Sequence, residues 1–169
     1  MKRYHVILII IIAFTVYSNT LNNDFTYDDD RTIVKNSLIR NLKNVPLFFI
    51  RPFSAGKESA VLKIAYRPLV LTSFALNYKL GGLDVPGYHI VNILFHAANA
   101  VLVYMLIIIL SGMEITGKKT QGKGGDICTA AFFASLLFAV HPVNTEAVNY
   151  IWQRSVLMVT FFCLSAMIL

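Results

Sequence analysis

One stretch of sequence decides the fold: residues 88–110 read YHIVNILFHAANAVLVYMLIIIL. The stretch contains no Asp, Glu, Lys or Arg. As an α-helix, which rises about 1.5 Å per residue, it would extend for about 34 Å and cover the hydrocarbon core of a bilayer. A charge-free apolar run of this length therefore predicts a membrane-spanning helix.

Three further apolar runs predict an all-α integral membrane protein with about four spans. With the first stretch, the predicted spans are residues 4–21, 88–110, 127–140 and 155–169. The run at 127–140 is short, so it spans only with flanking residues or in a thinned bilayer. The run at 155–169 is still apolar where the chain stops, which favours a portion of a longer protein.

The first run could be a signal-peptide core, because Lys2 and Arg3 precede it. No small-x-small cleavage site follows, since residues 18–21 are Ser-Asn-Thr-Leu. An uncleaved signal anchor is the favoured interpretation.

Composition excludes several classes of protein. Of 169 residues, 56% are hydrophobic and 14% are charged, whereas soluble domains carry about 25% charged residues. The net charge of +6 comes without a basic helix or a nucleic-acid motif, so no nucleic-acid partner is expected. Cys128 and Cys163 lie inside apolar runs and predict neither a disulfide nor a metal site.

The positive-inside rule orients the chain. Basic residues cluster before the first span and in the loop 111–126, which predicts that both face the cytoplasm; they are Lys2, Arg3, Lys118, Lys119 and Lys123. The loop 22–87 and the link 141–154 then face outward. We expect an integral protein of a bacterial inner membrane, with a cytoplasmic N-terminus and its active-site loop outside.

The outer loop 22–87 is expected to hold interfacial helices. Residues 66–80 are mainly apolar but too short to span comfortably. Pro68 stands where a first helical turn would begin, and Gly81-Gly82 follows as an end signal. This pattern predicts a helix lying on the membrane surface.

Three adjacent carboxylates, Asp28, Asp29 and Asp30, follow the first span by about ten residues. A carboxylate just outside a membrane can act as a general base on an acceptor hydroxyl or hold a divalent cation. Asp28 and Asp29 are the candidate catalytic residues and candidate metal ligands. The alternative is that the run forms a solvated turn.

A polar stripe marks the span 88–110. His89, Asn92, His96 and Asn99 are spaced by three, four and three residues, which places them on one helical face. Because polar groups in hydrocarbon are costly, this face should pack against other helices or a wet cavity. His89 lies at the outer end and is also a candidate substrate-binding residue.

The outer link adds an imidazole, a carboxylate and a guanidinium. His141 and Glu146 are further candidate catalytic residues on the same side as Asp28. Arg67 and Arg154 are candidates for binding a lipid phosphate, which suits a guanidinium fork. The alternative for Glu146 and Arg154 is a structural ion pair.

Four sequence motifs in this order resemble one family. They are FTYDDD at 25–30, YRPLVLTSFALNY at 66–78, GYHIVNILFHAANA at 87–100 and HPVNTEAV at 141–148. They are similar to the N-terminal membrane part of TMTC-type O-mannosyltransferases and their bacterial tetratricopeptide-repeat relatives.

The resemblance implies a partial GT-C-like helical bundle that uses a polyprenyl-phosphate-linked sugar as donor. It also implies a protein or glycan acceptor, and an acidic base or metal ligand in the first outer loop, which falls on Asp28 or Asp29. Family members have more spans and usually tetratricopeptide repeats. The alternative function is therefore a non-catalytic membrane subunit that keeps the outer loop as a binding or assembly surface.

Overall fold

The computed structural model describes residues 2–50, 66–112 and 124–169. These residues form helices and turns, with no strand among them. The predicted all-α class is therefore confirmed. The basic residues Lys118, Lys119 and Lys123 lie outside the described residues.

Four long helices correspond to the four apolar runs. They are α1 (Arg3–Tyr17), α4 (Val85–Gly112), α5 (Gly124–Val140) and α7 (Arg154–Ile168). A 3₁₀ turn, Ser18–Asn22, lengthens α1, so that Arg3–Asn22 is long and apolar enough to cross a membrane. Val85–Gly112 and Ile151–Ile168 meet the same criteria.

The third span along the chain is broken. Asp126–Val140 and Pro142–Asn149 are bent by 46° at His141, and together they are long and apolar enough to count as one span. Pro142 has no N–H to continue the α5 ladder, which accounts for the break. The protein is thus a membrane protein with three to four helical spans, as the sequence predicts.

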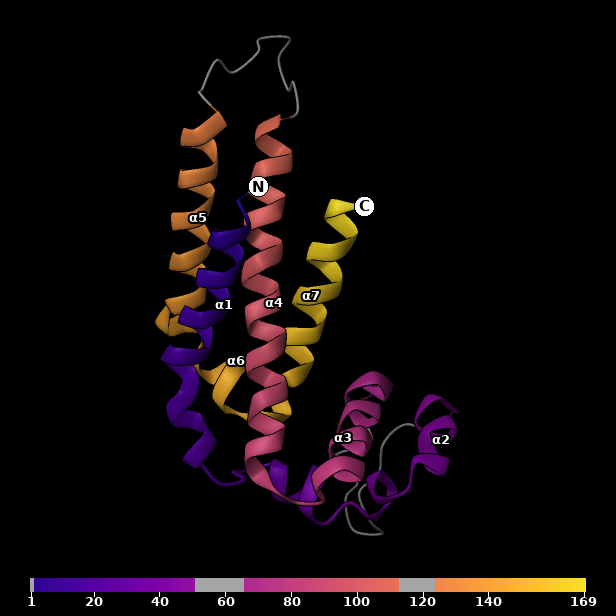
Figure 1. Cartoon of the computed structure of the whole chain (residues 1–169). Coiled ribbons are helices and arrows are strands. Elements are labelled where there is room, and N and C mark those ends of the chain that lie inside the picture. The colour runs from indigo at the N-terminus through magenta and orange to yellow at the C-terminus, as the bar shows by residue number, and fades with distance from the viewer. Residues whose placement is uncertain (1, 51–65, 113–123) are drawn as a thin grey trace.

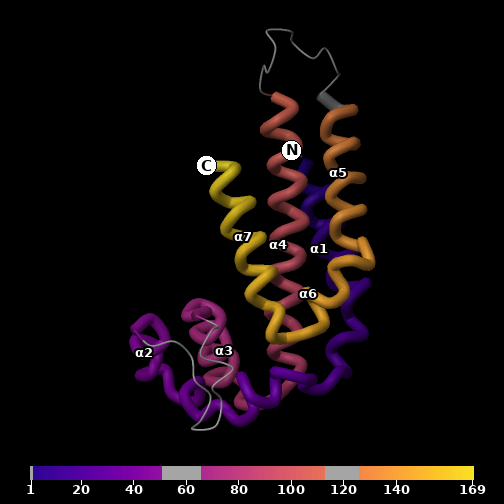
Figure 2. Tube along the Cα trace, turned by 180° about the vertical axis from the view of Figure 1, so that it is seen from behind, coloured from indigo at the N-terminus to yellow at the C-terminus, as the bar shows by residue number. Residues whose placement is uncertain are grey.

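Helix α4 is the centre of the bundle, with α1 and α5 on one side and α7 on the other (Figure 1). Seen from behind, the same arrangement holds, and both chain ends lie toward the same end of the bundle (Figure 2). The opposite end carries the short elements α2 (Val45–Ile50), α3 (Pro68–Gly81) and α6 (Thr145–Asn149). We call this opposite end the site end.

Helix α3 matches the helix predicted at 66–80, and its position on the membrane surface stays a prediction. Pro68 opens it, and the N–H of Gly82 closes it by donating to the carbonyl of Tyr78. Gly82 has a φ of 62°, a left-handed conformation that glycine adopts without steric cost.

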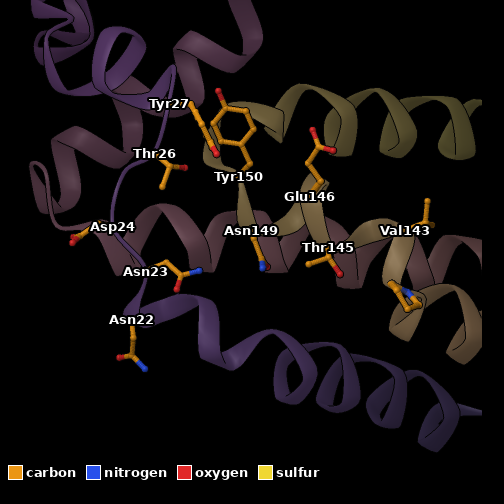
Figure 3. A pocket seen from close by; sticks show the side chains of 11 residues that line it. Asn22, Asn23, Asp24, Thr26, Tyr27, Val143, Thr145, Glu146, Asn149 and Tyr150 are labelled. Atoms are coloured by element: carbon orange, nitrogen blue, oxygen red, sulfur yellow. The ribbon is translucent and has the colours of Figure 1, made fainter.

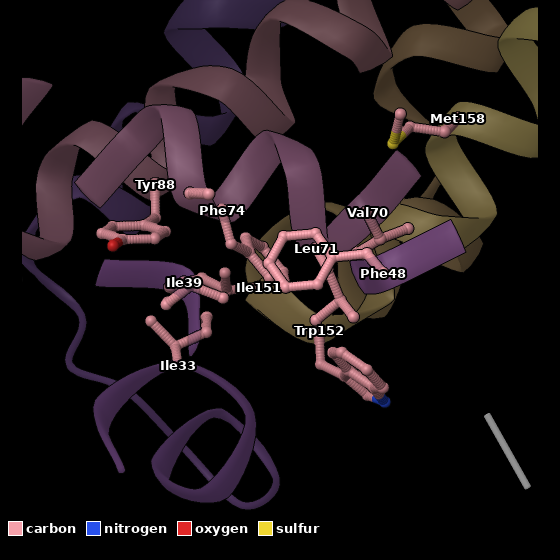
Figure 4. Close-up of a cluster of buried hydrophobic side chains, with 11 residues drawn as sticks. Ile33, Ile39, Phe48, Val70, Leu71, Phe74, Tyr88, Ile151, Trp152 and Met158 are labelled. Carbon is pink, nitrogen blue, oxygen red and sulfur yellow. The ribbon is translucent and has the colours of Figure 1, made fainter. Parts of the chain in front are cut away.

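A cluster of buried apolar side chains fastens the outer loop to the bundle (Figure 4). It joins Ile33 and Ile39 of the loop to Phe74 of α3 and to Trp152 before α7. The rings of Phe74 and Trp152 stack with centroids 6.2 Å apart. The cluster joins segments that are far apart in sequence. Its packing therefore fixes the position of the outer loop on the site end.

The polar stripe of α4 faces protein, as predicted. Asn92 donates to the carbonyl of Val148 at 3.2 Å, His96 Nε2 lies 2.9 Å from the carbonyl of Ala139, and Asn99 donates to the carbonyl of Leu157 at 3.0 Å. His89, at the outer end of the stripe, is also buried. The stripe therefore ties α4 to α5, α6 and α7 by hydrogen bonds inside the apolar bundle.

Candidate functional site

The loop after the first span, which keeps the name first outer loop after its predicted side, lies on the link between the third and fourth spans. The main-chain N–H of Asp28 donates to the hydroxyl of Tyr150 at 3.1 Å. The main-chain N–H of Trp152 donates to Asp29 Oδ1 at 2.9 Å. The acidic run and the link are thus in direct contact, although more than 120 residues separate them.

Asp29 is almost completely buried, with 1% of its surface exposed. Its second carboxylate oxygen accepts from the N–H of Thr26 at 3.2 Å. Burial, and secondarily the nearby carboxylate of Asp28, raise the pKa of Asp29 to about 6, while the two hydrogen bonds and the charge of Arg154 act in the opposite direction. Asp29 is therefore a carboxyl group that can exchange a proton near neutral pH.

The three carboxylates of the acidic run lie in three environments. Asp28 is half-buried beside Tyr150, Asp29 is buried, and Asp30 forms an ion pair with Lys35 at the surface. The alternative of a solvated turn describes Asp30 alone.

A cavity of about 930 Å³ opens beside this contact, between the first outer loop and the link (Figure 3). Its charged lining residues are Asp24 and Glu146, and its aromatic ones are Tyr27 and Tyr150. Amide, hydroxyl and apolar side chains complete the lining: Asn22, Asn23, Thr26, Pro142, Val143, Thr145 and Asn149. Tyr150 thus both lines the cavity and accepts the bond from Asp28.

Glu146 lies in this cavity, and His141 is not among its lining residues. The side chain of His141 instead caps the turn Pro142–Asn144, its Nδ1 accepting from the N–H of Val143 at 3.2 Å. Glu146 thus shares the cavity with Thr26 and Tyr27, which directly precede the acidic run, whereas Asp28, Asp29 and Asp30 are not lining residues themselves. This cap holds the imidazole of His141 at the break after α5, and the convergence of His141 with the carboxylates stays a prediction.

Arg154 is fully buried in the bundle. Its guanidinium donates to Asn92 Oδ1 at 2.8 Å, Asn77 Oδ1 at 2.7 Å, Ser73 Oγ at 3.0 Å and the carbonyl of Tyr88 at 2.9 Å. It thereby joins α3, α4 and α7. The alternative of an ion pair with Glu146 is not observed, since Glu146 accepts instead from Gln153 at 3.2 Å.

Arg67 has a different setting. Its guanidinium lies 4.9 Å from the centroid of the Trp152 ring, a cation–π contact. Its Nη1 is buried and has no hydrogen-bond partner among the described residues. Arg67 thus stands close to the residue that binds Asp29, with donor capacity to spare.

His89 is buried against the main chain of Asn23, but neither ring nitrogen makes a hydrogen bond of good geometry within the described part of the chain. It lies beneath the loop that lines the cavity. As to a metal, the described ranges contain no group of three or more His, Cys, Asp or Glu side chains close enough to hold an ion.

Sequence reasoning missed Asp24, Tyr27 and Tyr150. Tyr27 has a φ of 49°, unusual for a residue other than glycine, and its ring is 90% exposed beside the cavity. The aromatic residues around the acidic run were a signal in the sequence. Tyr150 and Asp24 carried no such signal, because their role depends on contact between distant segments.

Curated proteins similar to this chain share one description. Over 165 residues, 96% of this chain, it is 37% identical to "Protein O-mannosyl-transferase F38B6.6" of Caenorhabditis elegans. It is 33% identical over 159 residues, 91% of this chain, to human "Protein O-mannosyl-transferase TMTC4". The chain is a relative of the TMTC-type protein O-mannosyl-transferases.

This TMTC-type relative is also 34% identical to human "Protein O-mannosyl-transferase TMTC2" over 145 residues, 85% of its own length. It spans only part of these proteins: 22% of the C. elegans protein, 21% of TMTC4 and 16% of TMTC2. No family model and no solved structure matches it.

Proposed function

We propose that this chain forms the N-terminal part of a membrane glycosyltransferase of GT-C type. The enzyme transfers a sugar from a polyprenyl-phosphate donor to a protein acceptor on the non-cytoplasmic side. The observation that supports the proposal is the hydrogen bond between Asp28 and Tyr150, a residue that lines the cavity. The names of the similar proteins support a sugar donor and a protein acceptor.

In this proposal Asp28 is the catalytic carboxylate. It is half-buried and sits beside the cavity, so it can accept the proton of an acceptor hydroxyl as the hydroxyl attacks the sugar. Asp29, buried and bound to Trp152, holds the loop in place and can share the proton. A divalent cation on Asp28 and Asp29 would instead orient the acceptor with hard oxygen ligands.

The remaining predicted residues take roles that follow from their surroundings. Arg67 is the group for the departing lipid phosphate, because it keeps an unpartnered guanidinium nitrogen among the described residues. Glu146 orients the acceptor within the cavity. Three residues have positioning roles. His141 supports the turn Pro142–Asn144, His89 supports the first outer loop at Asn23, and Arg154 supports α3 through Asn77.

The test is sugar transfer in membranes that contain the complete protein. Asp28→Asn should abolish transfer of mannose from polyprenyl-phosphate mannose to protein, and Asp29→Asn should reduce it at least tenfold. Asp30→Asn is the matched control, because Asp30 pairs with Lys35 at the surface and should be replaceable. Full transfer by Asp28→Asn would refute the catalytic role.

The second candidate function is a non-catalytic subunit that uses the cavity for binding or assembly. The cavity between the first outer loop and the link, with the exposed ring of Tyr27 beside it, is the surface that such a subunit would offer to a partner. Absence of transfer by the wild-type protein, with the acidic run still required for assembly, would support this candidate. The predicted bacterial inner membrane and cytoplasmic N-terminus stay predictions, and the relatives named above are animal proteins.

A further inference from the structure

The cavity at the site end has charge of one sign. Its two carboxylates lie on opposite sides of the cavity: Asp24 on the first outer loop and Glu146 on α6 (Figure 3). Among the described lining residues there is no Lys, Arg or His. Two uncompensated carboxylates repel an anion, so the cavity does not suit the phosphate of a lipid-linked donor.

The arginines of the site lie outside the cavity. Arg67 stacks on Trp152, and Arg154 is enclosed by α3, α4 and α7. Neither is a lining residue. The two guanidinium groups, which favour an anion, are therefore separate from the acidic cavity. The acidic run contacts both regions: Asp28 bonds to Tyr150, which lines the cavity, and Asp29 bonds to Trp152, which contacts Arg67.

The rest of the lining suits a stretch of polypeptide. Asn149 is half-buried and lines the cavity, and a side-chain carboxamide can both donate to and accept from a peptide group. The exposed ring of Tyr27 lies 6.0 Å from that of Tyr150, centroid to centroid, and the pair offers an aromatic wall to an acceptor side chain. A cavity of about 930 Å³ holds several residues.

We infer that this cavity binds the acceptor peptide, and that Asp24 and Glu146 make it select segments with positive charge beside the acceptor hydroxyl. This inference rests on the proposed function, since it names the acceptor of the same site. It assigns charge selectivity to Asp24 and to Glu146, the residue that orients the acceptor in the proposed function.

Binding is measured separately from transfer, with the wild-type protein in nanodiscs of phosphatidylcholine, which carries no net charge. The probes are three labelled synthetic peptides with a central Thr flanked by Lys, by Asn or by Asp. Because exposed ion pairs are weak, we expect a roughly fivefold tighter Kd for the Lys peptide than for the Asn peptide, and weaker binding of the Asp peptide. The preference should shrink at high salt.

Variants locate the effect. Asp24→Asn and Glu146→Gln should each remove about half of the preference for the Lys peptide over the Asn peptide, and the double variant should remove all of it. Asp84→Asn is the control, because Asp84 is an exposed carboxylate at the site end that does not line the cavity. The Asp84→Asn variant should prefer the Lys peptide as strongly as the wild-type protein does.

Three results would overturn the inference: equal binding of the three peptides, no binding of any of them, or an equal effect of Asp84→Asn. These outcomes are distinct from failure of the proposed function. A protein that binds the Lys peptide selectively but transfers no sugar would retain the inferred peptide site and lose the enzymatic role.

Discussion

At the scale of single residues, the buried guanidinium of Arg154 is the least expected feature. A buried charge is costly unless its donors are satisfied. Here four neutral acceptors satisfy them, and the ring of Phe74 lies 4.6 Å from the guanidinium carbon. The geometry depends on the planar fork of arginine, which lysine lacks.

Arg154→Met should therefore destabilise the protein strongly, because it leaves Asn77, Asn92 and the Tyr88 carbonyl without their donor. We expect a loss on the order of 3 kcal/mol, measured as unfolding in mild detergent. Arg154→Lys should recover only part of it. Arg31→Met, at an exposed arginine, is the control and should change stability little; equal stability of wild type and Arg154→Lys would argue against the network.

Asp29 gives the second prediction at this scale. Its pKa in the folded protein is about 6, above the ordinary value of 3.8, so between these pH values the folded state binds more protons than the unfolded state. Stability from this group is fully present below pH 4 and is lost as the pH rises to about 6. The total change is about 3 kcal/mol.

The measurement is the unfolding midpoint in detergent between pH 4 and pH 7, compared with Asp29→Asn. The variant should lose this component of the pH dependence while Asp30→Asn keeps it. A wild-type midpoint that rises relative to Asp29→Asn over this range would contradict the sign.

At the scale of elements, α4 organises the bundle through its polar stripe. Three of its four polar side chains each reach a carbonyl on a different neighbour: Asn92 on α6, His96 on α5 and Asn99 on α7. Such bonds inside a membrane bundle contribute about 1 kcal/mol each, so the stripe specifies which helices pack rather than supplying most of the stability.

Substitutions at His96 distinguish the contribution of its hydrogen bond from the contribution of its ring packing. Its ring stacks on Phe138 at 5.6 Å and meets Tyr17 edge-on at 5.1 Å. His96→Phe keeps these contacts and loses only the bond to Ala139, so we expect a loss of about 1 kcal/mol in unfolding measurements. His96→Leu should cost more, because the aromatic contacts go as well; the reverse order would mean that ring packing contributes nothing.

At the scale of the whole molecule, the bundle separates two ends. The main-chain N–H of Lys2 donates to the hydroxyl of Tyr104 at one end, and the acidic run meets the link 141–154 at the other. If the bundle spans a bilayer, these two groups must lie on opposite sides.

Cysteine labelling in intact cells tests this arrangement. With Cys128 and Cys163 replaced by Ala, an impermeant maleimide should label Asp24→Cys and Val143→Cys from outside. Lys2→Cys should react only after the membrane is permeabilised. Labelling of positions 24 and 143 from different sides would exclude a shared site.

The positions of the long helices and the buried face of α4 follow from the sequence alone. Run length and helical periodicity are local properties, and a bilayer forces every apolar run of sufficient length to satisfy its backbone within a helix. For this reason the span 88–110 and its stripe from His89 to Asn99 could be predicted without a structure, as could the helix that begins after Arg67.

The site depended on the tertiary structure. Asp29 and Trp152 are 123 residues apart, and nothing near either residue signals their hydrogen bond. The same holds for Arg154. The sequence made it a candidate for binding a lipid phosphate, whereas its side chain is buried inside the bundle. Whether a polar side chain faces a ligand or the interior is decided by which distant segments pack around it, because burial is a property of the assembled bundle and not of the local sequence.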